Sequence, residues 1–215
     1  MRNEPKSKIS RIISLASKLP YFSLDNLSAV EKDKNYLKVL FSRYSKAGKI
    51  IRLKKGLYVA KEYIEEAKKN GAFSSYLEFL ANILYRPSYL SIDYILYEYN
   101  ILTEVPINYT LVTKKKTANF SNEFGNFFYH NIKENLFFGF DEIKVGELAV
   151  LKATKAKALF DFIYFRKNSI LGKKSADELR LNLSGINKAD KKELEIYIKL
   201  ERSKKMKEIF NYLFK

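Results

Sequence analysis

The stretch "FSRYSKAGKIIRLKKGLYVA", residues 41–60, holds six Lys or Arg residues and no acidic residue. It begins as the end of an amphipathic helix, which Gly48 is placed to close. Two short apolar runs follow, at 50–53 and 57–60, and Lys54-Lys55-Gly56 joins them in a tight basic turn where glycine can supply a positive φ. The stretch therefore predicts a helix followed directly by a β-hairpin.

Three helices are predicted before this hairpin. The first stops at Pro20. It buries apolar residues at intervals of three and four, namely Ile9, Ile12, Ile13, Ala16 and Leu19. Ser23 is a suitable N-cap for a short second helix, and Asp33 is one for the third. The third buries another such stripe, namely Leu37, Leu40, Phe41 and Tyr44. Three helices followed by a hairpin is the order of a winged helix-turn-helix.

The third helix presents a polar face when its apolar stripe points inward. Helical spacing turns Asn35, Lys38, Ser42 and Lys46 outward together, with Arg43 at the edge of that face. Such a helix fits the major groove of DNA, where polar side chains reach base edges. We expect Lys54 and Lys55, at the hairpin tip, to contact phosphate or the minor groove, with Arg52 assisting from the strand. The alternative is an ordinary solvated helix face followed by a basic turn.

Charge is distributed unevenly along the 215 residues, whose formal net charge is +16. Residues 1–61 have a net charge of +11, residues 62–165 of −2 and residues 166–215 of +7. A lysine-rich codon bias would act on all three segments alike, so it does not explain the neutral middle. The distribution favours a nucleic-acid partner for the first segment.

Composition limits the protein class. An apolar content of 47% with 30% charged residues is typical of a globular protein, and the absence of cysteine excludes disulfides, thiolate zinc sites and iron–sulfur clusters. The first residues, "MRNEPKSKIS", lack the apolar core of a secretory signal, and the apolar runs are too short for a membrane span. We expect a soluble cytoplasmic protein with no cofactor and no membrane partner.

The middle segment opens with two predicted helices. One spans 74–85 and breaks at Arg86-Pro87, and Ser88 then caps another that ends near Tyr99. This region contains four tyrosines whose rings suit either base stacking or core packing, namely Tyr89, Tyr94, Tyr97 and Tyr99. We assign all four to the core.

Aromatic and β-branched runs separated by turn residues follow, and they predict a small antiparallel sheet, with strands at 107–115, 126–132, 136–143 and 146–152. A helix over 154–165 completes a compact α+β domain.

The remaining residues predict basic helices. Ser175 with Glu178, and Asp190 with Glu193, have the spacing of capping boxes. The fold class is therefore α+β, with a winged helix at 5–61, a mixed α/β domain at 72–165 and a helical extension at 166–215. The basic extension suits additional DNA contact, an acidic partner or a solvated surface.

Signals for catalysis are weak. The chain has no P-loop, no dinucleotide-binding glycine pattern and no HExxH, and its one histidine, His130, has no assignable nucleophile beside it. Glu142 and Lys144 have the E-x-K spacing of metal-dependent nucleases, for which Asp93 would be an awkward upstream ligand. We expect a protein that is not an enzyme. A Mg²⁺-dependent nuclease, an RNA-binding module and a protein-interaction module are the alternatives.

Several motifs occur in an order that resembles one family. The run "G…I.R…GLY" ends the basic stretch, and "RPSYLSIDYILYEYNILTEVP" (86–106), "YTLVTKKK" (109–116), "FGF" (138–140) and "LKATKAKALFDFIY" (151–164) follow. This set, which covers most of residues 10–165, resembles the AbiEi-type antitoxins of bacterial type IV toxin–antitoxin systems.

The resemblance implies a protein with two activities. The N-terminal winged helix would bind inverted repeats in double-stranded promoter DNA and repress transcription. The following domain would neutralise a cognate nucleotidyltransferase toxin without forming a tight complex with it.

Overall fold

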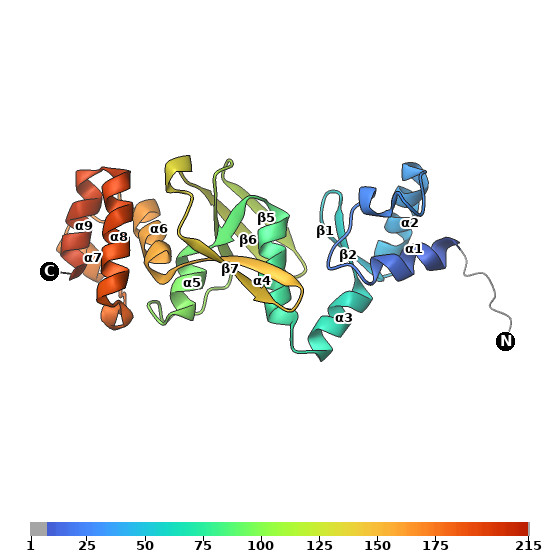
Figure 1. Cartoon of the computed structure of the whole chain (residues 1–215), viewed down its shortest axis with the longest axis horizontal. Coiled ribbons are helices and arrows are strands. Elements are labelled where there is room, and N and C mark those ends of the chain that lie inside the picture. Colours follow the sequence, from blue (N-terminus) through green and yellow to red (C-terminus); the bar gives the residue numbers. More distant parts are fainter. Residues whose placement is uncertain (1–7, 215) are drawn as a thin grey trace. The chain divides into compact units, whose positions relative to one another are not determined.

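A computed structural model describes residues 8–214 and shows a mixed α+β protein (Figure 1). Two compact units divide between Tyr76 and Leu77. The predicted first domain begins at residue 5, and residues 5–7 lie outside the described residues, as does residue 215 of the predicted extension. No helix in the described range combines the length and the hydropathy that a membrane span requires.

The first unit is built from helices around one two-stranded hairpin (Figure 1). Its elements in chain order are α1 (Lys8–Ala16), the 3₁₀ turn η1 (Asp25–Leu27), α2 (Lys34–Lys46), β1 (Ile50–Lys54), β2 (Leu57–Ala60) and α3 (Lys61–Lys69).

Local signals fix the ends of α2 and the hairpin as the sequence predicts. The Asp33 carboxylate accepts hydrogen bonds from the backbone N–H groups of Asn35 (2.8 Å) and Tyr36 (3.1 Å), which caps the helix. Gly48 follows the helix with φ of +67°, and Gly56 has φ of +80° in the turn between β1 and β2. The predicted helix cap, helix end and hairpin are therefore confirmed.

An aromatic cluster attaches α2 to the hairpin. Phe22, which precedes η1, exchanges two backbone hydrogen bonds with Tyr58 of β2, at 2.8 and 2.9 Å. The Phe41 ring lies 5.3 Å from that of Phe22 and 5.0 Å from that of Tyr58, both in edge contact. Phe22 and Phe41 are buried among the apolar residues of α1 and α2. The position of α2 relative to the hairpin is set by this cluster.

Two predictions for the first unit are wrong in detail. Helix α1 ends at Ala16, earlier than the predicted Leu19. Ser23 does not cap a helix, because its backbone N–H and its hydroxyl both donate to the side-chain oxygen of Asn26, at 2.8 and 2.9 Å. The residue before the turn is Leu24, whose side chain cannot cap it, and only a single 3₁₀ turn, Asp25–Leu27, forms there.

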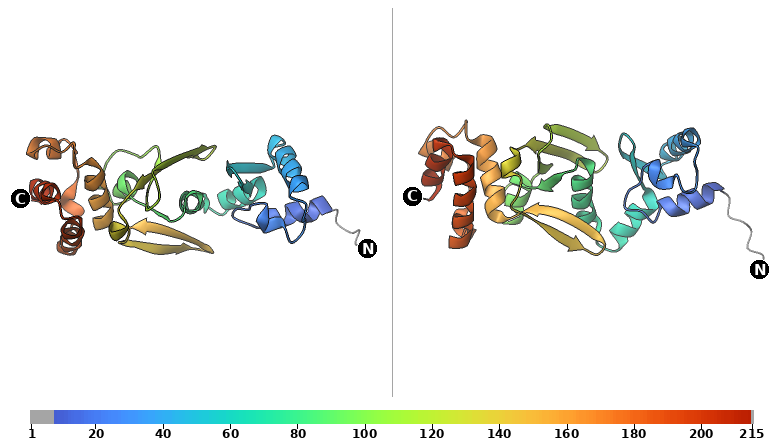
Figure 2. Two further views of the ribbon diagram at one scale, coloured as in Figure 1. Left: turned by 90° about the horizontal axis from the view of Figure 1, so that it is seen from above. Right: turned by 45° about the horizontal axis from the view of Figure 1, so that its top comes forward.

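The second unit is a six-stranded sheet with helices. Its elements in chain order are α4 (Phe73–Leu84, which begins before the division), β3 (Ser88–Leu90), α5 (Ile92–Glu98), β4 (Tyr109–Thr113), β5 (Ala118–Asn122), β6 (Gly125–Asn131), η2 (Glu134–Leu136), β7 (Phe140–Val145), β8 (Leu148–Ala153), α6 (Lys155–Arg166), α7 (Lys173–Asp177), η3 (Leu183–Gly185), α8 (Lys188–Glu201) and α9 (Lys204–Phe214). Helices α8 and α9 pack beside α6 (Figure 2).

The sheet is mixed, so the predicted antiparallel sheet is wrong. Its strand order is β5-β6-β4-β3-β8-β7, in which β3 pairs with β8 and β4 with β6 in parallel, while the other neighbours are antiparallel. The sequence pattern predicts where strands lie, but it does not predict which strands pair or in which direction. Strands β3 and β5 were also not predicted.

The predicted helix from Ser88 to Tyr99 begins too early. Residues Ser88–Leu90 form β3, whose backbone pairs with β4 at Thr113 and Leu111, and the helix starts only at Ile92. The core assignment holds for Tyr89, which is buried, and for the half-buried Tyr94. It is wrong for Tyr97 and Tyr99, which are exposed.

Helix caps in the C-terminal part differ from the predicted ones by one turn. Asn187 caps α8 through hydrogen bonds from the backbone of Ala189 and Asp190, and Asp190 is the third helical residue of that capping box. Ser175 lies inside α7, where its hydroxyl bonds to the backbone of Gly172. The helix predicted over 154–165 is confirmed as α6, capped by Thr154.

A buried ion pair lies in the core of the second unit. Lys157 Nζ is 2.8 Å from Asp161 Oδ1, and both side chains are 0% exposed. The hydroxyls of Tyr89 (2.9 Å) and Ser91 (2.8 Å) donate to the other Asp161 oxygen, and Lys157 also donates to the carbonyl of Leu136 (2.8 Å). Removal from water raises the pKa of Asp161 and lowers that of Lys157. Their mutual contact, these hydrogen bonds and the aromatic rings of Phe160 and Tyr197 beside Lys157 Nζ, at 4.7 and 5.1 Å, offset the cost of burying two charges.

Candidate nucleic-acid interface

Helix α2 holds the predicted DNA-facing residues on its solvent side. Leu37, Leu40 and Phe41 are buried against the first unit. All five predicted residues of the opposite face are exposed, namely Asn35, Lys38, Ser42, Arg43 and Lys46. The helical period alone separates the two faces, since residues three and four apart share a side of the helix.

Four of the predicted residues line a single concave surface. Lys38, Ser42 and Lys46 from α2 meet Arg52 from β1 around a shallow concavity of about 230 Å³. The rest of its lining is provided by Phe41, Ser45 and Tyr58. The aromatic cluster under α2 thus brings the basic residues of the helix and of the strand to one place.

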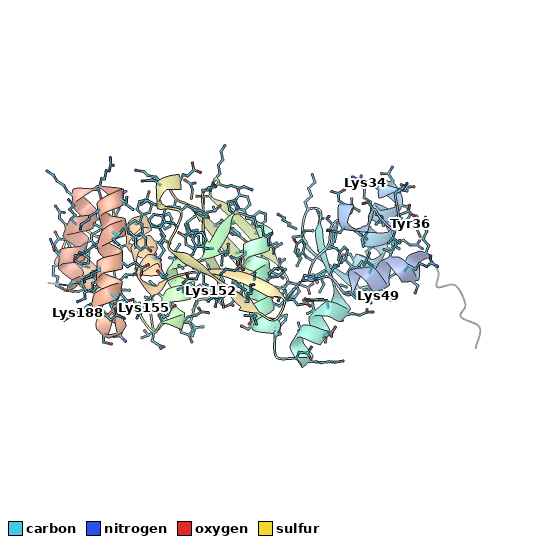
Figure 3. The ribbon with its side chains drawn as sticks, in the orientation of Figure 1. Lys34, Tyr36, Lys49, Lys152, Lys155 and Lys188 are labelled. Carbon is cyan, nitrogen blue, oxygen red and sulfur yellow. The ribbon has the colours of Figure 1, made fainter. Side chains whose placement is uncertain are left out.

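The other predicted residues lie outside this concavity. Asn35 and Arg43 are exposed elsewhere on α2, and Lys55 is exposed in the turn of the hairpin. Lys54 ends β1 and is half-buried. Figure 3 labels Lys34 and Tyr36 in the first turn of α2 and Lys49 just before β1.

The positive charge of this surface is not neutralised within the described residues. No carboxylate of residues 8–214 forms an ion pair with Lys38, Arg43, Lys46, Arg52 or Lys55. Other cations of the same unit do have partners, since Lys8 pairs with Glu31 and Lys34 with Asp25. A cationic concavity without a carboxylate is suited to an anionic ligand such as a phosphate backbone.

Sequence reasoning missed one exposed residue of α2. Val39 is 58% exposed and follows Asn35 by one turn of the helix. An apolar residue on a polar helix face was the signal that could have identified it.

The residues considered for nuclease chemistry are not brought together. Glu142 and Lys144 are exposed on β7, whereas Asp93 on α5 accepts two hydrogen bonds from Arg166, at 2.9 and 3.2 Å. Within the described part of the chain, no three His, Asp or Glu side chains form a group that could hold a metal ion.

His130 lies on β6 and is half-buried, with its ring 5.1 Å from that of Phe165. Burial lowers the pKa of His130, and the nearby Arg166 guanidinium lowers it further, while Asp93 opposes the shift. The imidazole is therefore neutral at pH 7, which suits a packed residue more than a general acid.

The shift of His130 predicts how stability depends on pH. The unfolded histidine has the higher pKa, so below about pH 6.5 the unfolded chain binds more protons and stability falls. We expect the free energy of unfolding to decrease more between pH 7.5 and 5.5 in the wild type than in His130→Gln. Urea unfolding at the two pH values measures this, and equal decreases in both proteins would contradict it.

A second charged cluster connects three elements of the second unit. Lys152 on β8 (Figure 3) lies 2.6 Å from a carboxylate oxygen of Glu78 on α4 and 2.8 Å from one of Glu98 on α5. The Tyr94 hydroxyl donates to the same Glu78 oxygen at 2.9 Å. These groups satisfy one another, and the cluster acts as a structural connection between helices and sheet.

Part of the positive charge of α6 and of the basic C-terminal segment is paired with carboxylates of the same unit. Lys155, Lys167 and Lys173 pair with Asp190, Glu201 and Asp177, respectively. Other lysines there are exposed, namely Lys174, Lys188, Lys192, Lys199, Lys204 and Lys207.

No family model matches the chain, and no curated protein matches it.

Proposed function

We propose that the chain is a DNA-binding transcriptional regulator whose first unit is a winged helix. In this proposal α2 is the recognition helix and the β1–β2 hairpin is the wing. The observation that carries it is the concavity in which Lys38, Ser42, Lys46 and Arg52 meet without a carboxylate partner.

The arrangement of the first unit supports this assignment. Its order is helix, short turn, helix and hairpin, and the segment before the short turn bridges to β2 through Phe22 and Tyr58. The thirteen residues of α2 make a helix roughly 20 Å long. A helix of that length fits the major groove, which is about 12 Å wide.

Each group on the surface has a distinct proposed role. Lys38, Lys46 and Arg52 neutralise phosphates and supply most of the affinity. Asn35 and Ser42 offer hydrogen bonds to base edges, since an Asn side chain can bond adenine through two atoms. Lys55 contacts phosphate or the minor groove from the tip of the wing.

We further propose that the protein is the antitoxin of a type IV pair and represses its own promoter. This part rests on the ordered motifs that resemble AbiEi-type antitoxins. In the second unit those motifs supply core residues, such as Tyr89 of β3 and Leu159 of α6. Gly139 of "FGF" has φ of +82°, and a Cβ there would overlap the Tyr197 side chain of α8. The proposed toxin is a nucleotidyltransferase that the second unit counteracts without tight binding.

Fluorescence anisotropy tests the DNA-binding part. The purified protein is titrated against a duplex from immediately upstream of its own gene and against a scrambled duplex of equal composition, over a series of salt concentrations. We expect tighter binding to the promoter duplex, with affinity falling linearly in log–log coordinates as salt rises. Equal binding to both duplexes that fades together with salt would contradict a sequence-specific regulator.

A further inference from the structure

The large apolar side chains that are exposed on the first unit belong to α2. In residues 8–76, the large apolar side chains that are exposed are Tyr36, at 36%, and Val39, at 58%. Both belong to the proposed recognition helix. Single exposed apolar residues are common on proteins, but here both lie on one helix of the unit.

Val39 lies within the solvent-facing stripe of α2. Asn35, Val39, Ser42 and Lys46 follow one another at intervals of four, three and four residues, so they share one side of the helix. The buried residues of α2 occupy the opposite side. Val39 is thus an aliphatic group among hydrogen-bonding and charged groups.

The stability of α2 does not require valine at this position. A β-branched residue loses side-chain freedom in a helix and is a poorer helix former than alanine. An exposed valine does not recover that loss through burial, since more than half of its surface faces solvent. A partner that covers the side chain would recover it.

The major groove offers one kind of apolar group on its base edges, the 5-methyl group of thymine. Valine has one strongly preferred rotamer in a helix, so it meets such a methyl group with little further loss of entropy. We propose that Val39 is a specificity-determining residue that contacts the 5-methyl group of a thymine in the operator. This inference rests on the proposed function and specifies one base, thymine, that the recognition helix would contact.

Replacement of thymine by uracil removes this methyl group and leaves all the hydrogen-bonding groups of the base in place. The promoter duplex is prepared by amplification with deoxyuridine triphosphate in place of thymidine triphosphate. We expect the wild type to bind the uracil duplex about fourfold more weakly for each methyl group that Val39 buries. Val39→Ala is expected to bind the thymine duplex about as weakly as the wild type binds the uracil duplex. Its affinity for the uracil duplex should be no lower than its affinity for the thymine duplex.

Val105→Ala is the matched control, because Val105 is 68% exposed on a loop of the second unit. It is expected to retain the fourfold preference for thymine. Because alanine favours the helix, Val39→Ala should unfold no earlier than the wild type, so weaker binding cannot be ascribed to misfolding.

The experiment separates this inference from the proposed function. Equal binding of both duplexes by the wild type, or an undiminished thymine preference in Val39→Ala, overturns the role of Val39 while promoter recognition stands. A wild type that binds the promoter duplex no better than its scrambled counterpart overturns both.

Discussion

Replacement of Lys38, Lys46 and Arg52 together by alanine is expected to weaken binding to the promoter duplex by on the order of a hundredfold or more near 0.1 M salt. Each phosphate contact releases condensed counterions, and the slope of log affinity against log salt is about 0.9 per contact. The slope should therefore fall by about three in the triple variant. Anisotropy titrations at several salt concentrations measure both quantities.

A second triple variant controls for the change in total charge. Lys61, Lys68 and Lys69 lie on α3 of the same unit and are exposed. Their replacement by alanine removes the same net charge without altering the concavity, so a loss of only a few-fold is expected. Equal losses in the two triple variants would show that the unit binds DNA through net charge alone and that the concavity has no special role.

Asp161→Asn is expected to lower the free energy of unfolding by about 3–5 kcal/mol, the range found when one member of a buried ion pair is removed. Asparagine has nearly the same shape and can still accept hydrogen bonds from Tyr89 and Ser91. The loss would therefore come from Lys157, whose ammonium group would remain buried without its counter-charge. Urea unfolding followed by circular dichroism measures the change.

Asp93→Asn is the matched control, because Asp93 also pairs with a cation of α6, Arg166, at 2.9 Å. That pair is about one-third exposed, so its contribution is about 0–1 kcal/mol. Comparable losses in the two variants would mean that burial does not set the importance of the Lys157–Asp161 pair.

The parts of the fold that the sequence predicts correctly depend on nearby residues. The cap of α2 needs only Asp33 and the next three residues, and the hairpin turn needs only a glycine with positive φ at Gly56. The mixed sheet depends on pairing between distant strands, such as Leu90 of β3 with Lys152 of β8. No local pattern encodes that register.

The burial of the Lys157–Asp161 pair also could not be predicted from nearby residues. Lys157 and Asp161 are four residues apart in a helix, a spacing that is also typical of a solvent-exposed pair. They are buried because Tyr89 and Tyr197, which come from distant elements, cover them.

The candidate interface was predictable in part. Helical periodicity identified the exposed face of α2, including Lys38 and Ser42. The meeting of that face with Arg52 was not predictable, because it depends on contacts of Phe41 with residues of the hairpin and of the segment before η1. Val39 was not predicted because only polar residues of the outward face were considered as candidates for DNA contact.

The burial of Lys157 also makes it a chemical reporter in this lysine-rich chain. Amine-reactive acylating reagents modify an amine only when its Nζ is accessible and deprotonated, and the exposed lysines meet the first condition in the native state. Lys157, which is 0% exposed, meets it only after α6 separates from the aromatic rings around it. When the reagent is concentrated enough for acylation to outpace reclosing, the time course at this single side chain, followed by mass spectrometry, gives the rate at which the second unit opens under native conditions.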